Sequence, residues 1–392
     1  MLVRVTERHV TLTLWEQDLA WSPTDPVAYA DVHVDGAPEM AYLGRRWESP
    51  VVSSAFAATE LIPSWNARTP AGSWLLVEAR VGGADGWTPW VVMARWTEGD
   101  PEGDGSITRT TVPDQKHEVG HVATDSFVAS ALHPFTQWQL RLTGFVPARE
   151  GDAGSAPGWP EVTLVAAAVS AMEIEPGEPT SRPALPGGCE IAVPPLSQRR
   201  HVDTFPEWDN GGQSWCSPTS TTMLLAHWGV APDADESAWV GHDIDPAVVH
   251  AVRRVFDRDY GAAGNWAFNT AYAGTRGLRA YVTRLRDLTE AEAFVAAGVP
   301  LVVSVSFTAD ELDGAGYDTR GHLLTIIGFT EDGDVVSNDP NSHQIASNEQ
   351  VRAVFRRDQF ERVWLGRDGG LAYVMHPRDV PLPPAPLEAN WS

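Results

Sequence analysis

The chain has 392 residues, a formal net charge of −24 and a sequence pI near 4.8. It is too long for one ordinary hydrophobic core, so we expect two domains. Because no basic stripe stands out against this acidic background, the composition argues against a nucleic-acid partner. A hydrophobic content of 43% with 20% charged residues is typical of a folded globular protein.

Only two cysteines occur, Cys189 and Cys216, and neither has the companion spacing of a structural zinc site. A disulfide between them would tie up the thiol discussed below, and we favour two free thiols. The N-terminal residues lack the uninterrupted apolar core of a signal peptide. No run of about 18 apolar residues is present to span a membrane. We therefore expect a cytoplasmic protein without membrane insertion.

The N-terminal part of the chain, residues 1–175, has the pattern of an all-β domain. Clusters of Gly, Pro, Asp and Ser separate short apolar, β-branched segments, and no convincing long helix interrupts them. This spacing favours an antiparallel β-sandwich of jelly-roll type. The clearest predicted strands are residues 10–15, 74–81, 90–96, 138–143 and 162–169.

This part also carries ten of the seventeen tryptophans. Exposed indoles would indicate carbohydrate or peptide binding, but we favour core packing and domain docking. His117, His121 and Asp125 have metal-binding chemistry, and their even-numbered spacing on one strand would place all three on one face. We favour a polar surface strand there and expect no metal or other cofactor.

Chain-breaking residues are concentrated between residues 176 and 194, which predicts a linker. Beyond it, helical and extended patterns mix, so we expect an α+β domain over residues 195–378. An extended tail is predicted for 379–392, and its proline-rich part, 381–386, is predicted to pack as an extended surface chain. The predicted helices are 217–228, 245–257 and 290–297, and the predicted strands are 300–305, 322–329, 334–337 and 371–376.

Cys216 stands at the start of a predicted helix, directly after Trp215. A thiol at a helix N-terminus lies near the positive end of the helix dipole and near unpaired N–H groups, which favour the thiolate. Pro218 suits the first helical turn, where a missing N–H costs nothing. Cys216 is therefore a candidate nucleophile, although a lone cysteine is often a small buried hydrophobic residue.

A candidate base, His322, opens an apolar strand roughly a hundred residues later. A turn near residues 330–334 would return the chain antiparallel and bring Asp339 within about one or two cross-strand pairs of His322. There the carboxylate would bind the imidazole Nδ1–H and set the tautomer. Asn338 could orient the ring instead, because the register is open at this point, and we favour Asp339.

Covalent acyl transfer also needs hydrogen-bond donors for the oxyanion of the tetrahedral intermediate. The backbone N–H of Cys216 can supply one donor. A side-chain amide upstream, from Gln198 or Gln213, can supply the second.

Four segments together resemble the bacterial cysteine peptidases related to bacteriocin-processing endopeptidases, the peptidase C39-like family of the papain-like clan. The resemblance covers about residues 190–376 and implies a helix carrying the nucleophile, packed on an antiparallel sheet carrying the base. It further implies Cys216 as nucleophile, His322 as base, Asp339 as orienting residue and Gln198 as the oxyanion glutamine. The segments are Val193-Pro194-Pro195-Leu196-Ser197-Gln198, Trp215-Cys216-Ser217-Pro218-Thr219-Ser220, Gly321-His322 and Asn338-Asp339-Pro340.

The chain departs from this family pattern in two places. Many relatives have glycine where this chain has Ser217, and about seventeen residues separate Gln198 from Cys216, more than in the toxin-exporting relatives. No transporter membrane domain or ATPase follows, so toxin export is not implied. The N-terminal part resembles the β-sandwich region beside this peptidase domain in actinobacterial relatives.

We therefore expect a cysteine peptidase that hydrolyses a peptide or isopeptide bond of a peptide or protein substrate through an acyl-enzyme. One alternative is an acyltransferase of the same fold. Another is a binding protein on a peptidase scaffold whose triad no longer turns over. The sequence leaves the substrate sequence, the role of the β-sandwich and the oligomeric state open.

Overall fold

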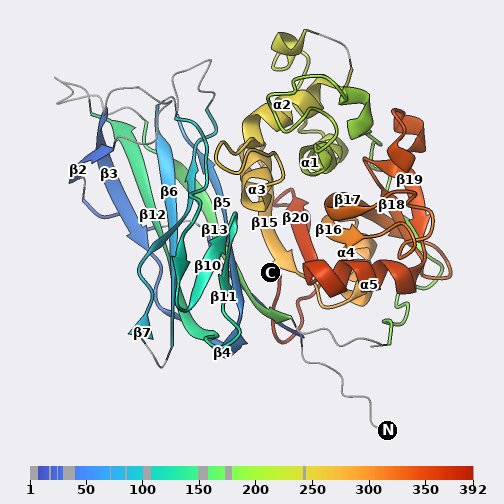
Figure 1. The fold of residues 1–392 in the computed structure, drawn as a ribbon, viewed down its shortest axis with the longest axis horizontal. Helices are drawn as coiled ribbons and strands as arrows, with labels where there is room; N and C mark the ends of the chain where they lie inside the picture. Colours follow the sequence, from blue (N-terminus) through green and yellow to red (C-terminus); the bar gives the residue numbers. More distant parts are fainter. Residues whose placement is uncertain are drawn as a thin grey trace.

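The computed structural model describes residues 8–16, 19–23, 25–29, 40–70, 72–83, 86–99, 107–148, 158–172, 179–241 and 244–391. Two predictions fall partly outside the described residues. One is the absence of a signal peptide, which concerns the N-terminus, and the other is the linker, of which Pro176 and Gly177 are not described. Figure 1 shows a body of strands only beside a body of mixed helices and strands. Within the described ranges, no helix combines the length and the apolar character needed to cross a bilayer.

The N-terminal body consists of two sheets in which all strand pairs are antiparallel. This confirms the all-β prediction for this part of the chain. One sheet has the order β1 (Arg8–Trp15), β13 (Glu161–Met172), β5 (Glu60–Arg68), β11 (Ser126–Ala129), β10 (Gly120–Ala123), β9 (Lys116–His117). The other has the order β2 (Asp25–Tyr29), β3 (Met40–Glu48), β12 (Phe135–Pro147), β6 (Trp74–Gly83), β7 (Gly86–Trp87), with β4 (Val52–Ala58) also on β12 and β8 (Val91–Trp96) also on β6.

Eight of these strands define how the chain winds between the two sheets. They are ordered β1-β13-β5-β11 in one sheet and β3-β12-β6-β8 in the other. The last strand in sequence therefore lies beside the first, and the strand before it lies beside β3, as in a jelly roll.

Large aromatic side chains fill the space between the two sheets. Trp65, Trp96 and Trp138 are buried in this core, whereas the buried Trp74 belongs to a separate cluster with Tyr42 and Phe145. Trp65 and Trp96 meet edge to face with ring centroids 6.2 Å apart, an arrangement that adds to their area of burial. Core packing is thus the main use of these residues, as the sequence predicted, and Trp87 on the short β7 is an exposed exception.

The C-terminal body is built around a third, antiparallel sheet with helices packed against it (Figure 1). The sheet has the order β15 (Arg279–Arg284), β20 (Leu371–His376), β16 (Leu301–Phe307), β17 (Thr319–Phe329), β18 (Val335–Asn338), β19 (Arg352–Phe355), with β14 (Cys189–Glu190) also on β17. The helices are α1 (Cys216–His227), α2 (Pro246–Val255), α3 (Trp266–Thr275), α4 (Leu288–Ala296) and α5 (Arg357–Asp368). Four short 3₁₀ segments complete it, η1 (Gln198–His201), η2 (Ala238–Val240), η3 (Ser342–Gln344) and η4 (Asn348–Gln350).

The predicted α+β class of this part is confirmed, but the sequence patterns missed two helices, α3 and α5. Residues 267–273 of α3 are all buried, so the helix lacks the polar stripe by which an amphipathic helix is recognised. In α5, Gly366 reads as a helix stop although the helix continues to Asp368.

The prediction of one polar surface strand through His117, His121 and Asp125 is wrong. His117 and His121 lie on the two arms of a hairpin, with Gly120 opposite His117 and His121 opposite Lys116. Asp125 follows Thr124, which has φ of 54°, and its side chain is buried. Across the described parts of the chain, no cluster of three or more His, Cys, Asp or Glu side chains could hold a metal ion.

The two bodies share a continuous interface along β5 and β15. Asn66 accepts a hydrogen bond from the Ala280 N–H (3.0 Å) and donates one to the Ala280 carbonyl (2.7 Å). Ser64 accepts from the Val282 N–H at 2.9 Å. Since β15 is an edge strand of its sheet, these side chains satisfy backbone groups that would otherwise be open to another chain.

The end of the C-terminal tail strengthens the same interface. The Ala389 carbonyl accepts from the Leu12 N–H at 2.9 Å, and Asn390 donates to the Arg284 carbonyl at 2.8 Å. Trp391 is 3% exposed and packs on Phe294 with ring centroids 5.0 Å apart. The last residues of the tail are therefore packed against the fold, because a large indole gains more by burial than by exposure.

The Asn66 contact yields a stability prediction. Asn66→Ala leaves both backbone groups of Ala280 without their partner, which we expect to lower the free energy of unfolding by about 2–4 kcal/mol. Urea denaturation measures this. Ser53→Ala, on the exposed side of β4, is the control and is expected to change stability by less than about 0.5 kcal/mol. If the two substitutions have equal effects, the hydrogen bonds of Asn66 to the edge strand β15 do not stabilise the fold.

Candidate active site

Cys216 is the first residue of α1, a helix buried on every side. All residues from Cys216 to Leu225 are buried. Some of their hydroxyl groups form hydrogen bonds to other elements. Ser220 donates to the Leu323 carbonyl at 3.0 Å, and Ser217 bonds the Tyr373 hydroxyl at 3.0 Å. The bond from Ser220 attaches α1 to β17 one residue after His322. The helix and the strand therefore hold Cys216 and His322 in a fixed relative position.

Two glycines allow the chain to enter α1 past η1. Gly211 has φ of +65°, which favours glycine. A Cβ on Gly212 would lie 2.1 Å from the Gln198 carbonyl oxygen, so no larger residue fits there. As a result Gln198 lies beside the loop before Cys216, and its side-chain Nε2 donates to the Gln213 carbonyl at 2.8 Å.

His322 and Asp339 are brought together by the pairing of β17 with β18. The imidazole Nε2 and Asp339 Oδ1 are 2.7 Å apart, and both side chains are buried. Asn338, the alternative orienting residue, instead donates to the Val193 carbonyl at 3.1 Å. The expected bond to Nδ1 is wrong. Since Nε2 faces the carboxylate, Nδ1 is the nitrogen left for the thiol.

The Asp339 carboxylate has further partners, which sequence reasoning missed. Its Oδ1 also accepts from the Asn341 N–H at 2.9 Å, and its Oδ2 accepts from the Tyr317 hydroxyl at 2.8 Å. The Tyr317 ring also lies edge-on to the His322 ring, with centroids 5.6 Å apart. Tyr317 follows a glycine-containing turn before β17, and no spacing in the sequence marks it as part of the site.

The electrostatics of the pair favour a protonated imidazole. Burial alone lowers the pKa of His322, but the Asp339 carboxylate and the nearby Cys216 together raise it from 6.5 to about 10. The pKa rises because an adjacent anion stabilises a buried cation far more than it would in water. At neutral pH the site therefore holds an imidazolium between a carboxylate and a sulfur atom.

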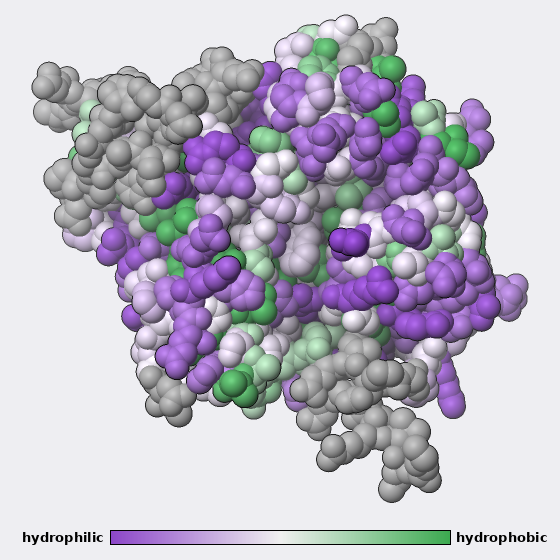
Figure 2. Space-filling view, viewed as in Figure 1, coloured by the Kyte–Doolittle hydropathy of each residue, from purple (hydrophilic) through white to green (hydrophobic). Residues whose placement is uncertain are grey.

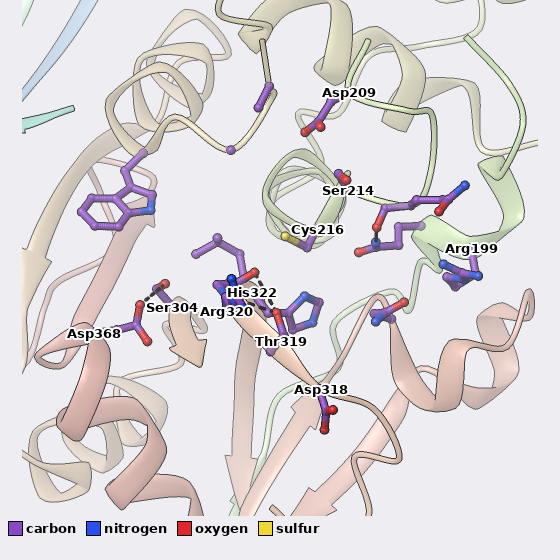
Figure 3. Close-up of a pocket in the computed structure, with 18 of the residues that line it drawn as sticks. Arg199, Asp209, Ser214, Cys216, Ser304, Asp318, Thr319, Arg320, His322 and Asp368 are labelled. Carbon is purple, nitrogen blue, oxygen red and sulfur yellow. Dashed lines mark hydrogen bonds between the residues drawn. The ribbon is translucent and has the colours of Figure 1, made fainter. Parts of the chain in front are cut away.

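These side chains open into a cleft of about 650 Å³. Gln198, Gln213, Cys216 and His322 all line it, whereas Asp339 lies behind His322 and is fully buried. Figure 3 shows Cys216 and His322 next to each other at its centre. The structure thus brings together all four residues predicted from the sequence, and it keeps the alternative amide, Gln213, on the exposed rim.

The walls of the cleft are polar. Figure 3 shows Asp209 and Ser214 on one side of Cys216, Ser304 and Asp368 on a second, and Arg199 on a third. Burial raises the pKa of both Asp209 and Asp368, because the protein atoms around each carboxylate replace water that would stabilise its charge. In the view of Figure 2, hydrophilic residues also dominate the surface of the C-terminal body. Such a cleft suits an extended polar chain better than a small apolar ligand.

Family models match both parts of the chain. Residues 190–370 match the model of the peptidase C39-like family, and residues 3–170 match the model described as the peptidase C39 N-terminal domain. Together these matches span most of the chain. The chain belongs to the peptidase C39-like family, and the resemblance drawn from the sequence is confirmed.

Solved structures and curated proteins add little. A provisionally assigned C39-like peptidase from Bacillus anthracis aligns at 19% identity and a TM-score of 0.29, covering 48% of this chain and 99% of that one. The enzymatically active domain of bacteriophage CBA120 tailspike protein 4 aligns at 10% identity and a TM-score of 0.17, covering 40% of this chain and 19% of that one. Neither score supports an argument. No curated protein matches the chain.

The raised pKa of His322 predicts how stability depends on pH. A group whose pKa is higher in the folded state stabilises the fold fully below its unfolded pKa, here 6.5, and loses this effect as pH rises towards 10. The difference in unfolding free energy between the parent chain and His322→Asn should thus shrink by up to roughly 5 kcal/mol between pH 6 and pH 10. Urea titrations at several pH values measure it. Asp339→Asn should lose the same pH dependence of the unfolding free energy. If the difference between the parent chain and His322→Asn stays constant with pH, the assigned ion pair is contradicted.

Tyr317 predicts a second effect on stability. Tyr317→Phe keeps the ring but removes a hydrogen bond to a buried carboxylate, which we expect to cost about 1.5–3 kcal/mol of unfolding free energy. Thermal or urea unfolding measures this. Tyr260→Phe, at a ring that is 48% exposed, is the matched control and should change little. If both variants are equally stable, the Tyr317 hydroxyl does not support Asp339.

Proposed function

We propose that the chain is a cysteine peptidase with a papain-like catalytic domain over residues 195–378 and an accessory β-sandwich over residues 1–175. One observation carries the proposal. A buried Asp339 holds one nitrogen of His322, and the ring lies beside a cysteine at the N-terminus of a central helix, within an open cleft. This is the geometry by which a base activates a thiol nucleophile.

In the proposed reaction, the Cys216 sulfur attacks the carbonyl carbon of a peptide or isopeptide bond. His322, carrying the proton taken from the thiol, delivers it to the leaving amine as the C–N bond breaks, which leaves a thioester on Cys216. Water then attacks the thioester, His322 accepts its proton, and the carboxylic acid product leaves with the thiol regenerated. Asp339 stays ionised throughout and orients the ring.

The oxyanion of each tetrahedral intermediate requires two donors. We assign these to the backbone N–H of Cys216 and to the side-chain amide of Gln198. An amide nitrogen carries two hydrogens, and one of those on Gln198 already donates to the Gln213 carbonyl. That bond, together with the bond from the Gln198 N–H to the Pro340 carbonyl at 3.0 Å, fixes the amide beside the nucleophile.

The two thiols of the chain provide a direct test of the nucleophile. We expect iodoacetamide to label Cys216 rapidly at neutral pH, because His322 lies beside it and can take the thiol proton. In His322→Ala, labelling of Cys216 at the same pH should be much slower, and peptide hydrolysis should fall by about 10²–10⁴-fold. Cys216→Ser should abolish hydrolysis. Cys189→Ser, at the exposed second cysteine, is the matched control and should leave both readouts unchanged.

The same experiments separate the alternatives. If iodoacetamide labels Cys216 slowly in the parent chain and at the same rate in His322→Ala, a binding protein on a peptidase scaffold is favoured. Product analysis with added amines separates hydrolysis from acyl transfer. Acyl-amine products without any free acid would contradict the proposed hydrolase.

A further inference from the structure

One wall of the cleft is attached to the N-terminal β-sandwich. The segment 256–265, which we call the cleft loop, leads from α2 to α3 and has neither helix nor strand of its own. Together with Trp266, the first residue of α3, it supplies one side of the cleft. The residues that line the cleft from this side are Tyr260, Ala262, Gly264 and Trp266.

Backbone and side-chain hydrogen bonds connect this loop to the sandwich at several points. Asp257 accepts from the Thr111 N–H at 3.0 Å, so a buried carboxylate of the loop is satisfied by the other domain. The Arg258 N–H donates to the Arg109 carbonyl at 3.1 Å, and the Asp259 N–H donates to the Thr110 hydroxyl at 3.2 Å. The loop therefore takes its shape from the sandwich segment 109–111 as well as from its own domain.

The contact nearest to the cleft is made by Asp125. Its Oδ2 accepts from the Trp266 N–H at 2.6 Å, across the domain interface. Asn265 caps the same helix by accepting from the Phe268 N–H, which leaves the Trp266 N–H for Asp125. An anion here also interacts favourably with the positive end of α3, a helix of ten residues.

The position of Asp125 makes this contact specific. Asp125 lies in the turn between β10 and β11, is 6% exposed, and comes from a part of the chain more than a hundred residues before α3. Burial raises the pKa of Asp125 to about 7, with Glu60 and Asp257 adding to the rise. Above that pH the group is charged, and in either form an oxygen remains to accept the Trp266 N–H.

We propose that Asp125 is a positioning residue for substrate binding, through which the β-sandwich holds Trp266 and the cleft loop in place as one wall of the cleft. The proposal rests on the proposed function in one respect, that the peptide lies in this cleft. It gives the sandwich a role in substrate affinity, with no part in the chemistry at Cys216. A substrate side chain on this side of the scissile bond would then pack against the indole of Trp266.

The test compares Asp125→Ala with Ser64→Ala in the full-length chain at pH 8. Ser64 is the matched control, because it also bonds a backbone N–H across the interface but does so on β15, away from the cleft loop. We expect Asp125→Ala to speed amide hydrogen exchange in residues 256–270 and to raise KM for a cleaved peptide roughly tenfold with kcat nearly unchanged. Ser64→Ala should do neither. Asp125→Asn, which keeps an oxygen acceptor, should restore most of the affinity.

Two further readouts keep the result interpretable. The rate of Cys216 alkylation by iodoacetamide should be the same in Asp125→Ala and in the parent chain, since the reagent is too small to need the wall. A loss of alkylation rate in step with the rise in KM, or equal exchange in the Asp125→Ala and Ser64→Ala chains, would overturn the proposal. Hydrogen exchange needs no turnover, so this arm decides the role of Asp125 even if the chain cleaves no peptide.

Discussion

The buried pair of His322 and Asp339 is the interaction on which the rest of the site depends. A carboxylate removed from water is costly unless its oxygens are hydrogen-bonded and its charge is paired. Here the imidazole, the Asn341 N–H and the Tyr317 hydroxyl together meet that requirement. His322 and Tyr317 come from β17 and the turn before it, whereas Asn341 follows Asp339 directly after β18, so the pair forms only when these two segments lie side by side. Helix α1 is tied to the same strand by Ser220, which sets the position of Cys216 relative to the ring.

The two parts of the chain behave as one physical unit. Asn66 and Ser64 of the sandwich satisfy backbone groups of the edge strand β15, and the end of the tail buries Trp391 against α4. Trp65 of the sandwich core packs edge-on against Phe268 of α3, at 6.2 Å between ring centroids. An interface made of buried aromatic rings and backbone hydrogen bonds resists sliding, because displacement would leave several buried polar groups without partners. The cleft loop, with no regular structure of its own, takes its shape from this rigid interface.

The local chemistry explains why the ring faces as it does. With Nε2 on the carboxylate, the proton carried by the other nitrogen can pass between the sulfur and a leaving amine without the ring turning. The lining of the cleft adds the carboxylates of Asp209 and Asp368, whose pKa values are raised by burial, and, on another side, the guanidinium of Arg199. The recognition surface is therefore polar and formed by several elements, which is what a chain-like substrate with repeated amide groups needs.

The sequence by itself determined the class of each half and predicted four residues that the structure brings together at the cleft. Local patterns can be recognised in a sequence without knowledge of the fold. Here they are the alternation of the short strands, the helix-start signals and the ordered motifs around Gln198, Cys216, His322 and Asp339. The sequence favoured Asp339 over Asn338 but could not fix the register, and a shift of one residue in strand register exchanges which side chain faces the ring. The nitrogen that faces the carboxylate, the support from Tyr317, the buried helix α3 and the link from Asp125 to Trp266 were decided only by the tertiary structure. These depend on contacts between residues far apart in the chain, and such contacts leave no periodicity or spacing to read.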